Sequence, residues 1–168
     1  MTTNTDRFRA HLAASRDAVW VVGRWLGSQG HEVVVPPTVM RPKSSDPKDY
    51  ADEGDLYVVR YNGRVPVWRR VEVKHSSRSF TGRADWPYPS FIVCACHAWD
   101  NATPKPHVIY TVNRDMTHVA CVHGNTAGTW TTRTVTDDRY NDYSQQVYMI
   151  DLSLVQWESL KPHELKTA

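Results

Sequence analysis

The sequence contains no long hydrophobic run. No apolar segment approaches the roughly 18–20 residues that a membrane-spanning helix needs. The start of the chain, Met1–Arg9, is polar and lacks the apolar segment of a signal peptide. These two absences argue against membrane insertion and against secretion. We therefore expect a cytoplasmic protein with no membrane partner.

Cysteine is scarce as well. The chain has three cysteines, an odd number that does not suit a disulfide framework, so reduced thiols are expected. Cys94, Cys96 and Cys121, with His97 and His123, offer soft ligands and raise a zinc site as an alternative. On a helix the first two would point about 200° apart, and the last cysteine and histidine have no second close pair. Buried, apolar cysteines are therefore favoured.

The sequence also has little net charge. Twenty Lys and Arg side chains stand against eighteen Asp and Glu, which gives +2 when histidine is neutral. This balance excludes the broad positive field of a histone-like or polybasic coat protein. Any contact with a nucleic acid must therefore be made by a local patch of the surface.

The length fits one domain over residues 1–168, since domains commonly have about 100–200 residues. Apolar residues recur at steps of three and four from Asn4 to Gln29, the spacing of one helix face, and Gly30 follows as a stop. Ser90 can cap a helix of about ten residues, although a buried strand there is an open alternative. Strands are expected at 33–35, 107–112, 118–122, around 130–135 and at 147–150. This order predicts a mixed α/β fold.

The dipeptide Asn62-Gly63 is a strong hairpin signal between two strand-like runs, 55–61 and 64–74. With these two residues as the turn, Tyr61 faces Arg64 and Asp55 lies opposite Arg70. Side chains of a strand alternate between its two faces, so one face is apolar and suits packing against a helix. Its members are Leu56, Val58, Val65, Val67, Val71 and Val73, joined by Arg60 and Arg69, which the pattern does not explain.

The opposite face of this hairpin brings two carboxylates and an ammonium group together. Glu72 and Lys74 are two residues apart on one strand, and Asp55 is the diagonal neighbour of Glu72 on the other. Diagonal Cβ atoms lie roughly 7 Å apart, a gap that two carboxylate arms can close around a hard cation such as Mg²⁺. Such an ion activates water, and a lysine beside it can orient or deprotonate that water. The residues therefore predict phosphodiester hydrolysis.

Two segments together resemble the motif of the PD-(D/E)xK nuclease superfamily. The first is Gly54-Asp55-Leu56-Tyr57-Val58-Val59, and the second is Val71-Glu72-Val73-Lys74, whose glutamate follows the aspartate by seventeen positions. Gly54 stands where the motif's proline would be. Four segments are more narrowly similar to small phage-encoded nucleases, a group with Holliday-junction-resolvase-like members. These segments are residues 52–55, 71–75, 85–87 and 107–110. The resemblance covers residues 10–122, and 123–160 would be a C-terminal strand extension.

The resemblance implies a restriction-endonuclease-like core of order αβββαβ, with a mixed central sheet flanked by helices. It also implies cleavage of DNA or RNA with Mg²⁺, for which Mn²⁺ can substitute. DNA is the expected substrate, with branched or recombination intermediates as one substrate class. Asp55 and Glu72 would bind the metal, and Lys74 would be the catalytic lysine. Junction-resolving relatives act as symmetric homodimers, and a phage-encoded member would work in the host cytoplasm.

Many members of the superfamily carry an extra acid on the first helix. Asp17 is a candidate for it, and Asp52 or Glu53, just before the motif aspartate, are alternatives. Ser76, Arg78 and Arg83 are candidate DNA contacts, with Lys105 a further cation for phosphates. Three aromatic residues either stack on unpaired bases or cover the sheet, and burial is favoured for them. They are Tyr57, Trp68 and Trp86.

Two alternatives stay open. The charged residues of the motif can be the solvated side of an amphipathic strand, with Asp55 a strand-start residue after a turn glycine. A nuclease fold can also lose its chemistry and persist as a nucleic-acid or protein binding module.

Overall fold

The computed structural model describes residues 4–37, 54–137 and 143–161. The expected first helix is confirmed as α1, Asn4–Ser28. It buries Ala18, Val22 and Leu26, which lie on one face because they are spaced by about one helical turn. Gly30 adopts a φ of +83°, a conformation that glycine tolerates best. The backbone therefore leaves the helix at the residue that the sequence indicated.

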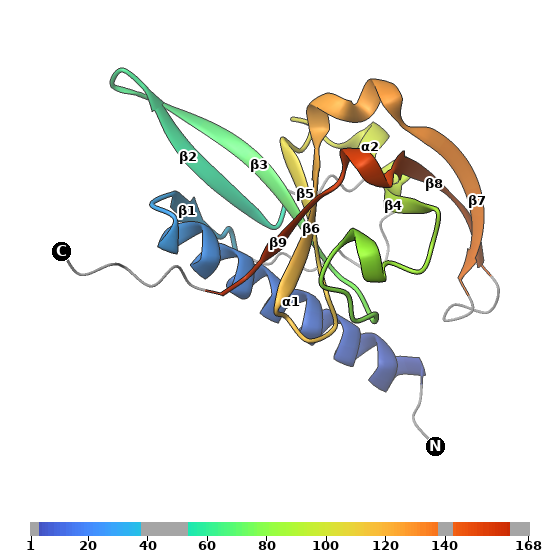
Figure 1. Ribbon diagram of the computed structural model, residues 1–168. Coiled ribbons are helices and arrows are strands. Elements are labelled where there is room, and N and C mark those ends of the chain that lie inside the picture. Colours follow the sequence, from blue (N-terminus) through green and yellow to red (C-terminus); the bar gives the residue numbers. More distant parts are fainter. Residues whose placement is uncertain (1–3, 38–53, 138–142, 162–168) are drawn as a thin grey trace.

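The largest element is a mixed six-stranded sheet, which α1 crosses on one side (Figure 1). The parallel pair in it is β3 with β5, and the other neighbours are antiparallel. The expected second hairpin is confirmed as β5 and β6, whereas β9 was not expected. In sheet order the strands are β1 (Glu32–Val34), β2 (Leu56–Asn62), β3 (Val65–His75), β5 (Val108–Val112), β6 (His118–His123) and β9 (Gln156–Ser159).

A second, antiparallel sheet has three strands in the order β4, β8, β7. Short helical segments connect the strands. The elements are β4 (Ser90–Ala95), α2 (Cys96–Asn101), β7 (Thr131–Asp137), β8 (Tyr143–Asp151) and the 3-10 turns η1 (Arg83–Asp85), η2 (Gly124–Thr129) and η4 (Leu152–Leu154). The expected strands near 130–135 and 147–150 are thereby confirmed.

The six-stranded sheet separates two hydrophobic clusters. On one face α1 packs against side chains such as Leu56 and Val71. On the other face Ile109 of β5 packs with Phe91 and Ile150 of the second sheet. The fold is therefore α/β with a mixed sheet, but the expected flanking by helices holds for one face, since strands β4 and β8 cover the other. Within the described residues no helix has both the length and the apolar composition to cross a membrane.

The hairpin between β2 and β3 has a different turn from the expected one. Asn62 pairs with Val65, so Gly63 and Arg64 form the turn, and Gly63 has the positive φ of +62°. A glycine at the first turn position is typical of a type II′ hairpin. The register moves by two residues, so Tyr57 rather than Asp55 lies opposite Arg70. Because side chains alternate with period two, the assignment to faces survives the shift.

The outer part of this hairpin, residues 60–69, forms a two-stranded ribbon that projects from the sheet (Figure 1). Among the described residues, β1 pairs with β2 only up to Val59, and β5 pairs with β3 only from Val71. Val65 and Val67 are consequently exposed and do not pack on a helix as expected. The exposure also explains Arg60 and Arg69, since no helix among residues 4–37, 54–137 and 143–161 covers the face on which they lie.

The helix expected after Ser90 is wrong for its first half. Phe91 and Val93 are buried and Ile92 is exposed, the alternation of a strand. A register shift between Ile92 and Cys94 then turns two consecutive residues inward, as a β-bulge does. That break in the alternation imitates a helical spacing. The strand alternative for this segment is the one that holds, and a helix begins only at Cys96.

Candidate active site

The carboxylate of Asp55 is bonded to the backbone of the neighbouring strand. Gly54, with a φ of +87°, precedes it, and the Asp55 N–H donates to Val71 O at 3.3 Å. Oδ2 of Asp55 then accepts from the Val73 N–H at 2.7 Å. The Asp55 side chain thus accepts a hydrogen bond from the β3 backbone just before the first residue of β2, Leu56. The carboxylate is held at the residue between Glu72 and Lys74.

Glu72 is bound by an arginine of its own strand. Nε and Nη2 of Arg70 lie 2.9 and 2.5 Å from Oε1 of Glu72, and the two side chains are 4% and 18% exposed. Residues two apart on a strand share a face, which explains the contact. A Cβ atom at Gly54 would lie only 2.9 Å from Arg70 Nε. The absence of a side chain at Gly54 therefore leaves room for the guanidinium group of Arg70.

Lys74 lies half-buried on the same face as Glu72 and pairs across to Thr111 of β5. The Thr111 hydroxyl is buried and has no hydrogen-bond partner among the described residues. Cys94 of β4 lies near this face. Burial raises the pKa of its thiol to about 11, and the charge of Lys74 opposes that rise. A strand of the second sheet, β4, therefore lies near the face of β3 that carries Glu72 and Lys74.

Two observations relate the three motif residues. Oδ2 of Asp55 accepts from the Val73 N–H, which lies between Glu72 and Lys74. The side chains of Glu72 and Lys74 share one face of β3 because they are two residues apart. Carboxylate oxygens are the donors that hard divalent cations such as Mg²⁺ prefer, so the chemistry of the pair fits the ion, provided Arg70 yields Glu72 to it. Within the part of the chain that the structure describes, no group of three or more His, Cys, Asp and Glu side chains is placed to hold a metal ion.

The candidates for an additional acid have different outcomes. Asp17 is exposed on α1, whose buried residues Ala18 and Val19 face the sheet. It lies on the opposite side of the sheet from Glu72 and Lys74, so the structure does not bring it to them. Asp52 and Glu53 lie outside the described residues.

The cysteines do not form the zinc alternative. All three are buried and free, but they belong to different layers. Cys94 lies in the cluster between the two sheets, and Cys121 lies in the cluster beneath α1. The six-stranded sheet separates these two thiols, as the preference for buried, apolar cysteines anticipated.

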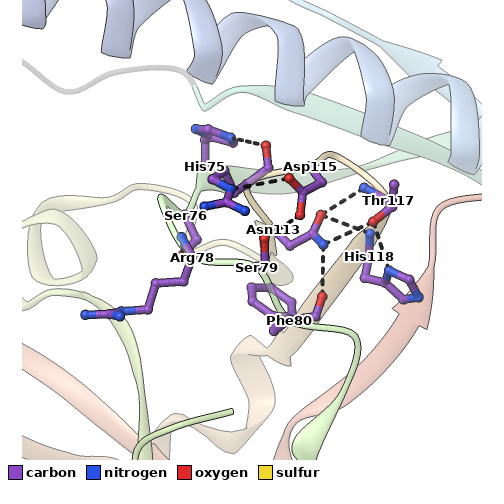
Figure 2. Close-up of polar contacts among 10 residues, drawn as sticks. His75, Ser76, Arg78, Ser79, Phe80, Asn113, Asp115, Thr117 and His118 are labelled. Atoms are coloured by element: carbon purple, nitrogen blue, oxygen red, sulfur yellow. Dashed lines mark hydrogen bonds and ion pairs between the residues drawn. The ribbon is translucent and has the colours of Figure 1, made fainter. Parts of the chain in front are cut away.

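The candidate DNA contacts follow the motif along the chain. The Ser76 N–H donates to Val112 O at 2.8 Å, and the Ser76 hydroxyl accepts from the Arg78 N–H at 3.1 Å. The exposed guanidinium group of Arg78 lies 5.0 Å from the centre of the Tyr88 ring and points away from the polar cluster in Figure 2. Arg83 is exposed in η1. Ser76 thus shapes the loop, while the two arginines are surface cations.

Sequence reasoning missed Asn113, which anchors that loop. The residue is 2% exposed. Its Nδ2 donates to Phe80 O at 2.9 Å and to Thr117 Oγ1 at 3.1 Å, and its Oδ1 accepts from the Thr117 and His118 N–H groups. Figure 2 shows these bonds, together with one from Ser79 to Asp115. The loop after Lys74 is therefore tied to the β5–β6 turn. In sequence that turn, residues 113–117, resembles any hairpin loop.

Comparison with protein-family models gave no match for the chain, and comparisons with curated proteins and with solved structures gave none either. The likeness to the nuclease superfamily therefore depends on the motif residues. Their placement in the fold is described above.

Proposed function

We propose that the chain is a metal-dependent nuclease that hydrolyses phosphodiester bonds of DNA with Mg²⁺ or Mn²⁺. The observation that carries the proposal is the bond from the Val73 N–H to Asp55 Oδ2. It holds one carboxylate at the residue flanked by the other carboxylate, on Glu72, and by the ammonium group of Lys74.

In this proposal Asp55 and Glu72 hold the ion. When bound, a divalent cation polarises a phosphate oxygen and lowers the pKa of a water molecule. Lys74, on the same strand face as Glu72, orients or deprotonates the attacking water. Arg70 neutralises the Glu72 carboxylate and fixes its position, which avoids an uncompensated buried charge.

The order of elements supports a restriction-endonuclease-like core as part of the proposal. The chain runs α1, β1, β2, β3, then β4, α2 and β5. With β4 taken as an insertion, this is the order αβββαβ. The parallel pairing of β3 with β5 places the strand after the second helix beside the strand that carries Glu72 and Lys74.

A cleavage assay tests the proposal. Plasmid, linear, single-stranded and four-way-junction DNA are incubated with the full chain and Mg²⁺, Mn²⁺ or EDTA. We expect cleavage that EDTA abolishes and that Lys74→Ala lowers by about 10²-fold or more, since a positioned acid or base commonly contributes 10²–10⁴-fold. Lys161→Ala removes an exposed lysine elsewhere and is the matched control. Equal cleavage by both variants would contradict the assigned role.

The Arg70–Glu72 ion pair favours a second candidate, a nucleic-acid binding module without catalysis. In that case the arginine permanently neutralises the glutamate and no metal is needed. Binding of DNA in EDTA, with no cleavage of any of the four substrates by folded protein, would select this module over the nuclease.

Sedimentation of the protein with junction DNA reports whether a homodimer forms, as symmetric cleavage of two strands requires.

A further inference from the structure

A pocket with a volume of about 390 Å³ lies at the base of the β2–β3 ribbon. One wall comes from β3, and the other comes from the segment that joins α2 to β5. The volume falls in the range of about 300–1,000 Å³ that is usual for ligand sites. The lining side chains include Trp68, Arg69, Trp99, Lys105, His107 and Asn125, and none of the described residues that line the pocket is acidic.

The pocket has two tryptophans of different character. Trp99 is braced by Trp130, whose ring centre lies 4.6 Å away at an interplanar angle of 64°. Trp68 is 53% exposed and meets Tyr57 edge-on at 6.0 Å. An exposed indole beside a braced one provides flat apolar surface, on which bases of any type can stack.

The pocket carries fixed positive charge. Nζ of Lys105 donates to the carbonyl oxygens of Trp99 and Asp100 at 2.5 and 2.7 Å. An ammonium group has three N–H donors, so the contacts given by the described residues leave one for a ligand. Nη1 of Arg69 lies 2.8 Å from Nε2 of His107. A guanidinium group only donates hydrogen bonds, so Nε2 of His107 accepts this one and the arginine carries the charge. Burial and the charge of Arg69 lower the pKa of His107.

The pocket adjoins both the candidate active site and a basic ribbon. Arg70 lines the pocket and also binds Glu72. Residues 60–70 contain four arginines and no acid, and Arg60 and Arg64 are exposed. A polyanion that enters the pocket would therefore pass along positive charge toward Glu72 and Lys74.

We propose that this pocket binds an unpaired nucleotide of a nucleic-acid strand. The base stacks on Trp68, and the neighbouring phosphates contact Arg69 and Lys105. The inference deepens the proposed function and rests on it in one respect, namely that the strand so bound is the strand that is cleaved. Binding itself requires no cleavage and can be measured separately.

The test uses fluorescein-labelled DNA and the full chain in EDTA, with fluorescence anisotropy as the measurement. The probes are a 12-nucleotide single strand, a blunt duplex of the same sequence and that duplex with a single-stranded overhang. We expect the single strand and the overhang to bind more tightly than the blunt duplex. Trp68→Ala should weaken their binding by about 5- to 100-fold, the usual effect of losing one stacked base.

Matched controls separate the pocket from the rest of the surface. Trp20 is 54% exposed on α1, so Trp20→Ala removes an equally exposed indole and should leave binding unchanged. Lys105→Ala should reduce the slope of log affinity against log salt by about one phosphate contact, whereas Lys161→Ala should not. Equal binding by Trp68→Ala and wild type would overturn the inference. So would blunt duplex binding at least as tightly as the single strand, because that assigns the ribbon to a duplex groove.

The two proposals fail in different ways. If Lys74→Ala loses cleavage while Trp68→Ala and Lys105→Ala bind like wild type, the nuclease stands and the nucleotide pocket falls. If no substrate is cleaved but Trp68→Ala loses the single strand, the pocket stands as the site of a binding module.

Discussion

The guanidinium group of Arg70 binds Oε1 of Glu72 through both Nε and Nη2, with 4% of the arginine side chain exposed. A carboxylate proposed to bind a metal is thus already neutralised by a buried cation. The ion pair makes the stability of the protein and its affinity for a divalent cation depend on the same two groups.

Arg70→Met should therefore destabilise the protein, because removal of one partner of a buried pair leaves an uncompensated charge and costs roughly 3–5 kcal/mol. Urea unfolding measures this loss. If Asp55 and Glu72 form a metal site, Mg²⁺ should raise the melting temperature of this variant more than that of wild type. Arg60→Met, at an exposed ribbon position, is the matched control. A variant as stable as this control would contradict the importance of the pair.

Gly54→Ala should also be destabilising, for two reasons that act together. The φ of +87° is strained for any residue with a Cβ, and that Cβ would meet Arg70 Nε at 2.9 Å. We expect a loss of at least about 1 kcal/mol in unfolding free energy. Gly27→Ala is the informative counterpart, because Gly27 lies in α1 with nothing within 4 Å of an added Cβ. There alanine should stabilise by about 0.5–1 kcal/mol. The same sign for both substitutions would refute this explanation.

Asn113→Ala should loosen the loop that follows Lys74. The substitution leaves the Phe80 carbonyl and the Thr117 and His118 N–H groups without the partner seen in Figure 2. Phe80 is buried, and a buried acceptor left without a partner costs about 1–3 kcal/mol. Hydrogen exchange of loop 76–82 should accelerate along with a fall in unfolding free energy. Asn125→Ala, at an exposed position in η2, is the control. Unchanged exchange in the loop would show that the asparagine does not anchor it.

Stability should fall with acid in a way that depends on His107. Its pKa is lowered by burial and by Arg69, so at pH values below the ordinary histidine pKa of about 6.5 the unfolded chain binds more protons than the folded one. The stabilisation from a neutral ring is present above that pH and is lost as the pH falls through the lowered folded-state value. Denaturant unfolding between pH 8 and 5 should show a smaller decline for His107→Asn than for wild type, with His97→Asn, in α2 and outside the pocket, as the control. Identical slopes for His107→Asn and wild type would be evidence against this account.

The faces of the β2–β3 hairpin could be predicted although its turn could not. Asn62-Gly63 indicated a hairpin, and the true turn at Gly63 and Arg64 moved the register by two residues. A shift of two preserves which side chains share a face, so the assignment to faces holds for the paired residues 56–62 and 65–71. A shift of one would have reversed it. Asp55 lies just before β2, and its place in a site with Glu72 and Lys74 stays a prediction.

The misread segment and the unforeseen residues have identifiable causes. The bulge near Val93 broke the alternation of β4, and local periodicity could not distinguish that break from a helix. Asn113 bonds locally to Thr117 and His118, as an asparagine in a turn can, but its bond to the Phe80 carbonyl, 33 residues earlier in the chain, could not be predicted from local sequence. The pocket unites Trp68 with Trp99 and Asn125, a juxtaposition created by sheet order. Such contacts are tertiary, and the sequence pattern does not encode them locally.

The separation of the core into two clusters gives each layer its own chemical reporter. Cys94 is enclosed between the sheets and Cys121 between the large sheet and α1. A thiol reagent reaches the first only when the sheets part, and the second only when the helix lifts. The order in which the two sulfurs become modified in rising denaturant therefore records which layer opens first.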